Sequence, residues 1–417
     1  MLPKAWRRST LGEIAHITSG GTPDRSRPDY WGGDVPWVTT GEIQFNTITD
    51  TVEKITAAGL QNSAAKVFPP GTLLMAMYGQ GKTRGQVAKL SIEAATNQAC
   101  AAIHLRDKHD VDFYFQYLIS QYDKLRELGN AGTQKNLNGG IIKGFDVPVP
   151  PYGEQRRIAK ILASWDQAIA TTERLLLNSQ EQKLLISQQM LTGKVRLKEF
   201  PASGRKQKTP YGALPIEWGY RRIGDLAVEV SQKLGGEDPY PVLSCTKHKG
   251  LVDSLAYFNK QVFSADTSTY KVVPRGCFVY ATNHIDEGSI GYQDLYDFGL
   301  VSPMYTVFKA NDEVDDAYLF ALLKTEHYRQ IFASATNASV DRRGSLRWKD
   351  FRNLHIPLPP IEEQRAIAKV LAGAVREAEL IQAQLELLRD EKAALMSQLL
   401  TGKRRVKLPD AESGVQA

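Results

Sequence analysis

VPVPPYGEQRRIAKILA, at residues 147–163, returns almost unchanged as IPLPPIEEQRAIAKVLA at residues 356–372. The offset between the two stretches is 209 residues. At the same offset, QMLTGK at residues 189–194 aligns with QLLTGK at residues 398–403. More than forty residues therefore align without a gap, which identifies an internal repeat and decides the architecture of the chain.

Each copy of the repeat predicts one long helix. A Pro-Pro pair opens both copies, and proline suits the entry of a helix but not its interior. Acidic side chains near the start, such as Glu154 and Glu363, complement the positive end of the helix dipole. Gly193 and Gly402 suit the left-handed conformation that ends many helices. Roughly forty residues at 1.5 Å each make a rod of about 60 Å, which we interpret as a spacer between two globular bodies.

Apolar residues in both predicted helices recur in alternating steps of four and three, which is a heptad pattern. Neither seam can face water along its whole length, so we expect the two helices to pack against each other. Two unrelated amphipathic core helices are the alternative. The first seam comprises Ile158, Leu162, Trp165, Ile169, Thr172, Leu176, Ser179, Lys183, Ile186 and Met190. The second comprises Ile367, Leu371, Ala374, Ala378, Ile381, Leu385, Leu388, Lys392, Leu395 and Leu399.

The regions before the two helices are related more faintly. LGEIA at residues 11–15 resembles IGDLA at residues 223–227, and KVFPPGTLLM at residues 66–75 resembles KVVPRGCFVY at residues 271–280. These short apolar runs predict strands. Helices are expected at Val111–Leu128 and Val314–Ala333, so the fold class is mixed α/β. The expected domains are a first globular domain at 1–150, a first spacer helix at 151–193, a basic linker at 194–214, a second globular domain at 215–359, a second spacer helix at 360–402 and a basic C-terminal tail at 403–417.

The composition is that of a globular protein with two or three domains, since the chain has 417 residues of which 42% are hydrophobic and 24% are charged. No apolar run approaches the roughly 18 residues of a membrane span. The N-terminus lacks the apolar segment of a signal peptide. Three scattered cysteines, Cys100, Cys245 and Cys277, argue against a disulfide framework. We expect a cytoplasmic protein.

The net charge is +6, which favours a polyanionic partner only weakly. Two basic runs stand out, one between Lys194 and Lys208 and one over residues 403–407. Such runs are usually solvated linkers and tails, and contact with DNA phosphates is the other interpretation.

Several segments resemble those of a known protein family. SGGTP at residues 19–23, followed by Tyr30-Trp31 and VPWV at residues 35–38, is similar to the opening of the recognition domains of type I restriction–modification specificity subunits. The two PPxxEQR segments and the two LTGK endings resemble the limits of that family's spacer helices. The second domain departs from the pattern, because it has SQKLGG at residues 231–236 in place of the SGGTP signature.

The resemblance implies two target-recognition domains held apart by antiparallel spacer helices, each domain reading one half of a bipartite site in double-stranded DNA. It implies that two modification (methyltransferase) subunits dock on the helices and that restriction subunits complete the complex. S-adenosylmethionine, ATP and Mg²⁺ would belong to those partners, with no cofactor, no metal and no catalysis in this chain. The residues expected to bind partners are Gln155, Arg156, Gln364 and Arg365.

Three segments of the sequence resemble catalytic or metal-binding motifs. AMYGQGKT at residues 76–83 satisfies a relaxed phosphate-loop pattern, but Gly85 so soon after it favours a strand–turn–strand. The PPY at residues 150–152 lacks the Asp, Asn or Ser that adenine methyltransferases place before it. Cys245, His248, Cys277 and His284 could nominally hold zinc, although their spacing is unusual and the first domain has no counterpart.

Base reading needs side chains that can make paired hydrogen bonds, and loops on a rigid scaffold are the place to expect them. The candidates in the first domain are Thr22, Arg25, Arg27, Tyr30, Lys82, Arg84, Gln134, Lys135 and Asn136. Those in the second are Lys247, His248, Lys249, Asn283, His284, Arg342, Arg343 and Arg347. The sequence therefore predicts a non-catalytic DNA reader. The alternatives are the reader of a related system that joins cleavage and methylation in one polypeptide, a coiled-coil protein-binding scaffold, and a nucleotide-binding protein.

Overall fold

The computed structural model describes residues 2–79, 81–129, 136–200, 203–234, 240–337 and 344–407. The chain divides into two compact units. Unit 1 comprises Met1–Arg174 and Ala383–Ala417, and unit 2 comprises Leu175–Gln382. Each unit therefore combines one globular domain with part of both long helices.

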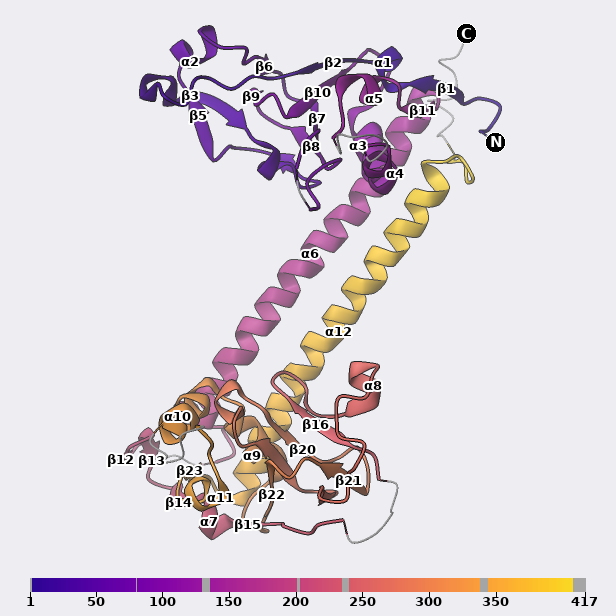
Figure 1. The fold of residues 1–417 in the computed structure, drawn as a ribbon. Helices are drawn as coiled ribbons and strands as arrows, with labels where there is room; N and C mark the ends of the chain where they lie inside the picture. Colours follow the sequence, from indigo (N-terminus) through magenta and orange to yellow (C-terminus); the bar gives the residue numbers. More distant parts are fainter. Residues whose placement is uncertain are drawn as a thin grey trace. The chain divides into compact units, whose positions relative to one another are not determined.

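Unit 1 carries a five-stranded sheet in the order β2-β10-β7-β8-β4, a four-stranded sheet in the order β5-β3-β9-β6, and the pair β1-β11 (Figure 1). Its strands are β1 (Arg7–Thr10), β2 (Ala15–Ser19), β3 (Trp31–Val38), β4 (Thr47–Ile48), β5 (Glu53–Ile55), β6 (Val67–Phe68), β7 (Leu73–Ala76), β8 (Val87–Leu90), β9 (Ala94–Thr96), β10 (Cys100–Leu105) and β11 (Asp146–Val149). Its short helices are α1 (Leu11–Ile14), η1 (Pro28–Tyr30), η2 (Thr40–Glu42), α2 (Ala57–Gln61), α3 (Val111–Ser120), α4 (Tyr122–Leu128) and α5 (Gly139–Lys143).

Unit 2 carries a four-stranded sheet in the order β15-β22-β19-β20 and the pairs β12-β13, β14-β23, β16-β17 and β18-β21. Its strands are β12 (Lys206–Thr209), β13 (Gly212–Pro215), β14 (Gly219–Arg222), β15 (Ala227–Glu229), β16 (Leu243–Thr246), β17 (Gly250–Asp253), β18 (Lys271–Pro274), β19 (Phe278–Ala281), β20 (Ile290–Tyr292), β21 (Phe298–Val301), β22 (Tyr305–Ala310) and β23 (His355–Leu358). Its short helices are α7 (Ile223–Leu226), α8 (Ser254–Phe258), η3 (Ile285–Glu287), α9 (Asp316–Leu323), α10 (Glu326–Asn337) and α11 (Trp348–Phe351).

The central strands of the two units correspond in register. In unit 1, Cys100 of β10 is paired with Ala76 of β7, and in unit 2 Tyr305 of β22 is paired with Ala281 of β19. Each residue of the unit 2 pair lies 205 positions after its counterpart in the unit 1 pair (305 − 100 and 281 − 76). The mixed α/β fold and its internal repeat are therefore confirmed in backbone pairing as well as in sequence.

The central strand of each unit is buried on both faces, because successive side chains along a strand point to opposite sides of the sheet. In unit 1, Leu73 and Met75 belong to the core that includes α3 and the start of the first long helix. Leu74 and Ala76 belong to a second core, with Val38 at the end of β3. One face of the central sheet thus carries the helical frame, and the other carries the parts that differ between the units.

The two long helices are α6 (Tyr152–Leu191) and α12 (Ile361–Leu399). The predicted seam residues on both are buried or half-buried, which confirms the heptad assignment. In unit 1 the helices run antiparallel, since Asp166 pairs with Lys392 and Glu173, farther along α6, pairs with Arg389, earlier on α12.

The predicted left-handed glycines are found after both long helices. Gly193 has a φ of 65° and Gly402 a φ of 74°. A β-carbon on Gly193 would lie 2.5 Å from the ring of Pro215, and one on Gly402 would lie 2.6 Å from that of Pro3. Both positions therefore require glycine for conformation and for close packing.

Three expectations for the globular domains need correction. Residues 11–14 and 223–226 form single helical turns, α1 and α7, and the strands begin only at Ala15 and Ala227. The helix expected over Val111–Leu128 is broken at Gln121 into α3 and α4. The helix expected over Val314–Ala333 is likewise broken at residues 324–325 into α9 and α10, and α10 continues to Asn337. Local propensity does not place these boundaries, because the adjoining sheet decides where each segment must turn.

Candidate functional site

In unit 1, four loops meet at one end of the central strand β7. The Gly21 N–H donates to the Thr96 carbonyl at 2.9 Å, and the Met77 N–H donates to the Ala99 carbonyl at 2.8 Å. The Leu137 N–H in turn donates to the Met77 carbonyl at 3.0 Å. We call the described residues of 20–22, 77–85, 97–99 and 136–138 the unit 1 loop cluster.

The unit 1 loop cluster brings together several of the predicted DNA-contacting residues. The Thr22 hydroxyl donates to the side-chain carbonyl of Gln98, and both residues come from loops beside β7. Lys82 is exposed and Asn136 is half-buried. Gln134 and Lys135 lie outside the described residues. The cluster thus presents amide, hydroxyl and ammonium groups of the kind that recognise bases and phosphates.

Arg84 corrects one expectation. Only 8% of the residue is exposed, and its guanidinium lies against α4, with Nη2 3.5 Å from the Arg126 carbonyl. The tight turn at Gly85, whose φ is 84°, directs the chain back into β8 and leaves Arg84 beneath the loop. Arg84 therefore supports the loop from inside in this structure and is not available to DNA.

The segment after Thr22 carries three more candidates. The Arg25 guanidinium lies 3.7 Å from the centre of the Trp31 ring and forms a two-point ion pair with Glu53. Arg27 forms a similar pair with Asp29 and lies 4.9 Å from the Tyr30 ring. Both arginines are exposed, so each could reach a phosphate if it left its carboxylate partner.

Unit 2 has a corresponding loop cluster at the end of β19. The Leu346 N–H donates to the Thr282 carbonyl at 2.8 Å. This is the counterpart of the bond from Leu137 to Met77, displaced by 209 and 205 residues (346 − 137 and 282 − 77). We call the described residues 246–249, 282–288 and 344–347 the unit 2 loop cluster.

The exposed side chains of the unit 2 loop cluster include most of the predicted DNA-contacting residues of the second domain. They are Lys247, His248 and Lys249 in the β16–β17 turn, Asn283 and His284 before η3, and Arg347 at the start of α11. His284 lies with its Nδ1 atom 3.1 Å from the Glu287 carboxylate. Arg342 and Arg343 lie outside the described residues.

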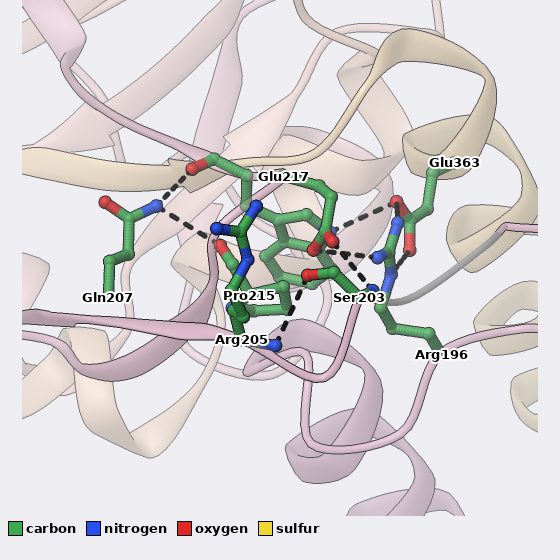
Figure 2. A network of polar contacts seen from close by, with 8 residues as sticks. Arg196, Ser203, Arg205, Gln207, Pro215, Glu217 and Glu363 are labelled. Carbon is green, nitrogen blue, oxygen red and sulfur yellow. Dashed lines mark hydrogen bonds and ion pairs between the residues drawn. The ribbon is translucent and has the colours of Figure 1, made fainter.

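In unit 2, a buried ion pair joins the segment that follows α6 to the start of α12 (Figure 2). Arg196 donates to both carboxylate oxygens of Glu363 at 2.7 Å, and the Trp218 indole donates to the same carboxylate at 3.1 Å. Arg196 also pairs with Glu217 at 3.1 Å. Hydrogen bonds from the hydroxyl and the N–H of Ser203 lower the pKa of Glu217 to about 2.

Unit 1 repeats this arrangement with residues from both ends of the chain. Glu154 accepts from the Trp6 indole at 3.1 Å and from Arg405 Nε at 2.8 Å. In each unit the network joins the start of one long helix to the segment that follows the other. The charged groups of each network pair with one another, so the network supports the structure of its unit.

The expectation that Gln155 and Gln364 bind a partner is wrong, because both are fully buried. Gln364 accepts from the Asp315 N–H at 2.9 Å and donates to the Pro359 carbonyl at 2.8 Å. Gln155 makes the same bonds with the Asp110 N–H and the Pro150 carbonyl, both at 2.8 Å. These amides fasten each long helix to its domain. The neighbouring Arg156 and Arg365 are exposed and stay candidates, Arg365 with a 2.7 Å ion pair to Glu362.

Within the described residues, the phosphate-loop and zinc motifs do not have the geometry that their chemistry requires. The loop at residues 76–83 joins the antiparallel strands β7 and β8, and no helix begins at Lys82–Thr83 to present backbone N–H groups to a phosphate. The three cysteines are free and buried. Within the described ranges, no group of three or more His, Cys, Asp or Glu side chains is placed to hold a metal ion. The same ranges contain no helix long and apolar enough to cross a membrane.

Sequence reasoning missed four residues at the loop clusters. Tyr78 is 40% exposed and Gln98 is exposed in unit 1. Arg126 and Lys324 donate to loop carbonyls from the helices behind the clusters. No motif marks any of them, because their role depends on contacts between segments far apart in the sequence.

Comparison with known proteins gives one consistent picture. The family model described as the type I restriction modification DNA specificity domain matches residues 3–179 and again residues 215–389. The MjaVIII specificity subunit of Methanocaldococcus jannaschii is 23% identical over 97% of this chain and 94% of its own length. The MjaIX specificity subunit of the same organism is 29% identical, but that match spans only 40% of this chain and 39% of the relative.

Solved structures show the same fold. The S subunit of a type I restriction–modification system from M. genitalium has a TM-score of 0.55 and 14% identity, and the match covers 97% of each chain. The HsdS subunit from Thermoanaerobacter tengcongensis has a TM-score of 0.53 and 17% identity, with 97% of this chain and 98% of that one covered.

Proposed function

Because this chain belongs to the family of type I restriction–modification DNA-specificity proteins, we propose that each of its two globular domains reads one half of a bipartite site in double-stranded DNA. The observation that carries the proposal is the repetition of a common frame beneath two different loop clusters. The frame includes paired central strands in identical register and the Gln155 and Gln364 fastenings.

The two units differ in the elements that lie on the far face of the central sheet, as expected for two domains that read different half-sites. Unit 1 inserts the β5-β3-β9-β6 sheet on the far face of its central sheet, whereas unit 2 places the β16-β17 and β18-β21 pairs there. The edges of base pairs are distinguished by the pattern of donors and acceptors that faces them. Two clusters built from different loops therefore favour two different half-site sequences.

The long helices are proposed to set the distance between the half-sites and to dock the modification subunits. Large apolar side chains on them are exposed well beyond what the seam requires. They are Leu175, Leu177, Leu184 and Leu185 on α6 and Val375, Leu380 and Leu387 on α12, each between 41% and 67% exposed. Exposed leucines in such number favour a protein partner that covers them.

In this proposal the chain itself performs no covalent chemistry. S-adenosylmethionine, ATP and Mg²⁺ are bound by the modification and restriction subunits, and the assembly works in the cytoplasm. The support is the composition of the two loop clusters, which offer hydrogen-bonding and cationic side chains suited to recognition.

The testing experiment is methylation mapping of host DNA by single-molecule sequencing, with this chain co-expressed beside a type I modification subunit. A split, asymmetric motif carrying methyladenine in both halves, absent without this chain, is the expected result. A stable complex that adds no methylation would refute the DNA-reading proposal and leave a protein-binding scaffold.

The distance-setting role has its own test. Inserting one heptad into each long helix preserves the seam and lengthens each by about 10 Å, which corresponds to about three base pairs. The motif should keep both half-sites and gain about three unread base pairs between them. An unchanged spacing in a complex that still methylates would contradict this role.

A further inference from the structure

Behind each loop cluster lies a pair of short helices that contributes a cation to the loop backbone. In unit 1 the helix is α4. Arg126 donates through Nη2 to the Gly81 carbonyl at 2.6 Å and through Nη1 to the Tyr122 hydroxyl at 2.9 Å. The Tyr122 hydroxyl itself donates to the carbonyl of Lys82. Two successive carbonyls of the 79–85 loop are thus tied to one helix.

In unit 2 the cation is Lys324, which follows α9. Its ammonium donates to the Lys247 carbonyl at 2.8 Å and to the Gly288 carbonyl at 2.9 Å. These carbonyls belong to two different loops of the unit 2 cluster, one carrying Lys247–Lys249 and the other carrying Asn283 and His284. Lys324 therefore joins the two segments that bear the exposed candidate side chains.

The ammonium of Lys324 lies in a partly desolvated environment, where its hydrogen bonds to carbonyl oxygens offset the cost of burying a charge. The residue is half-buried, and desolvation lowers the pKa of its ammonium. A cation is costly to bury unless its donors are satisfied, and here two of the three available donors meet carbonyl oxygens. Removal of the ammonium would leave both carbonyls without this donor.

The loops that receive these donors contain glycines in the left-handed region. Gly81 has a φ of 70°, with no atom within 4 Å of the place a β-carbon would occupy, and Gly288 has a φ of 91°. Glycine in the left-handed region loses more backbone entropy on ordering than any other residue. A loop of this kind presents a fixed pattern of donors to DNA only when something else holds its backbone.

The two cations are not copies of each other. At the 205-residue offset that relates the central strands, Arg126 aligns with Ile331 and Lys324 aligns with Ile119. The fastening glutamines at the helix starts, by contrast, are identical in both repeats. Arg329 of α10 also donates to the loop after β19, through Nε to the Asp286 carbonyl at 3.3 Å. The contact particular to unit 2 is therefore the one by which Lys324 joins two loops.

We propose that Arg126 and Lys324 are positioning residues for base recognition, each holding the loop backbone of its own unit so that exposed side chains meet the base edges of one half-site. The inference rests on the proposed function of the chain. It adds that discrimination between half-site sequences depends on two residues that need not touch DNA.

The experiment uses the full chain in complex with a modification subunit and scores methylation on an oligonucleotide set with every single base-pair change in each half-site. Lys324→Met and Arg126→Met remove the donors and keep an unbranched stem. Lys324→Arg keeps a cation. The matched controls are Lys309→Met, at the far end of β22 from the cluster, and Lys124→Met, on α4 with its ammonium 5.3 Å from the Phe145 ring.

Lys324→Met should lower discrimination in one half-site by about tenfold and leave the other half unchanged, since a lost base contact is worth about one order of magnitude. Arg126→Met should do the reverse, Lys324→Arg should recover most of the loss, and both controls should match the wild type. Hydrogen exchange should accelerate in the loops of the mutated unit and not in its central strands.

Three results would overturn the inference. Unchanged discrimination would show that the loops hold themselves. Equal weakening on every sequence, with a shallower salt dependence, would show that the cation contacts phosphate. Equal loss in both half-sites would indicate a general defect of the chain. Failure of the proposed function is separate, because the wild-type complex would then yield no split motif at all.

Discussion

Replacing Arg196 with methionine should destabilise unit 2 by about 3–5 kcal/mol, because it leaves a buried carboxylate without its charged partner. The side chain of Glu363 is 1% exposed and that of Arg196 is 8% exposed. After the substitution Glu363 keeps the Trp218 indole at 3.1 Å as a neutral donor, which cannot replace a two-point guanidinium contact.

The equivalent substitution in unit 1, Arg405→Met, provides the matched comparison. Glu154 is as buried as Glu363, with 4% of its side chain exposed, but the side chain of Arg405 is 44% exposed. Water can therefore occupy the place of the lost guanidinium, and the expected cost is about 1–2 kcal/mol. Arg196 also pairs with Glu217 at 3.1 Å, so both variants are compared in the Glu217→Gln background. There the contrast reports burial, because the bonds from arginine and indole to the buried carboxylate are alike in the two units.

Amide hydrogen exchange resolved by peptide measures both costs in one protein, since peptides from the other unit serve as the internal reference. Each variant should lower the opening free energy only in its own unit. The double variant Arg196→Met/Glu363→Gln should regain part of the loss, because no charge then stays buried. Equal costs for Arg196→Met and Arg405→Met would refute the reasoning that burial sets the energy.

Three further perturbations follow from contacts in the same structure. Gln364→Ala removes a fully buried amide that bonds to three backbone groups and should cost roughly 2–5 kcal/mol in urea unfolding of unit 2; a cost below that of an exposed glutamine would contradict the fastening role. Glu217 has a pKa lowered to about 2, so it contributes stability above its ordinary pKa of 4.5 that is lost as the pH falls towards 2. Glu217→Gln should flatten the acid unfolding profile of unit 2 over that range, and an unchanged profile would assign the acid sensitivity elsewhere. Leu385→Ala deletes a seam residue that is 3% exposed and should cost about 2–5 kcal/mol by thermal or urea unfolding, whereas the exposed Leu387→Ala should cost little in the isolated chain.

The repeated part of the fold could be predicted from sequence because its causes are local and occur twice. The heptad spacing identified both seams, and the Thr-Gly-Lys endings identified Gly193 and Gly402 as left-handed positions. The helices begin at Tyr152 and Ile361, each directly after its Pro-Pro pair. Periodicity and glycine chemistry are sufficient for such features.

Contacts between distant segments could not be predicted in the same way. Gln155 and Gln364 follow charged residues at the start of helices whose sequence resembles a solvent-exposed surface. The sequence therefore predicts a partner-binding role for two side chains that are in fact buried. Arg196 lies in a basic run that resembles a solvated linker, yet it pairs with Glu363, 167 residues away. The identity of the glutamines in both repeats was the one available signal, since residues common to two differing readers belong to their shared frame.

The candidate reading residues were partly accessible to prediction. Loops after the central strands were the correct place to search, and Lys247–Lys249, Asn283 and His284 lie together there. Arg84 is not among the exposed residues, because the turn at Gly85 buries its side chain. The sequence does not predict this burial, since the direction of a loop side chain depends on the contacts of the whole loop cluster.

The joint at the base of unit 1 has a topological consequence. Pro3 packs on Gly402, and Trp6 and Arg405 share Glu154, so the first and last described segments of the chain complete the same joint that the continuous stretch from Gly193 to Trp218 completes in unit 2. The order of segments is therefore circular: one continuous segment forms the joint in unit 2, and the first and last described segments together form it in unit 1, which is where the ring is open. A gene rearranged to join the old ends and open the ring between residues 197 and 213 would encode every contact of both joints. Recombination at the repeated helix sequences could likewise exchange one reading cassette for another while the frame that receives it stays the same.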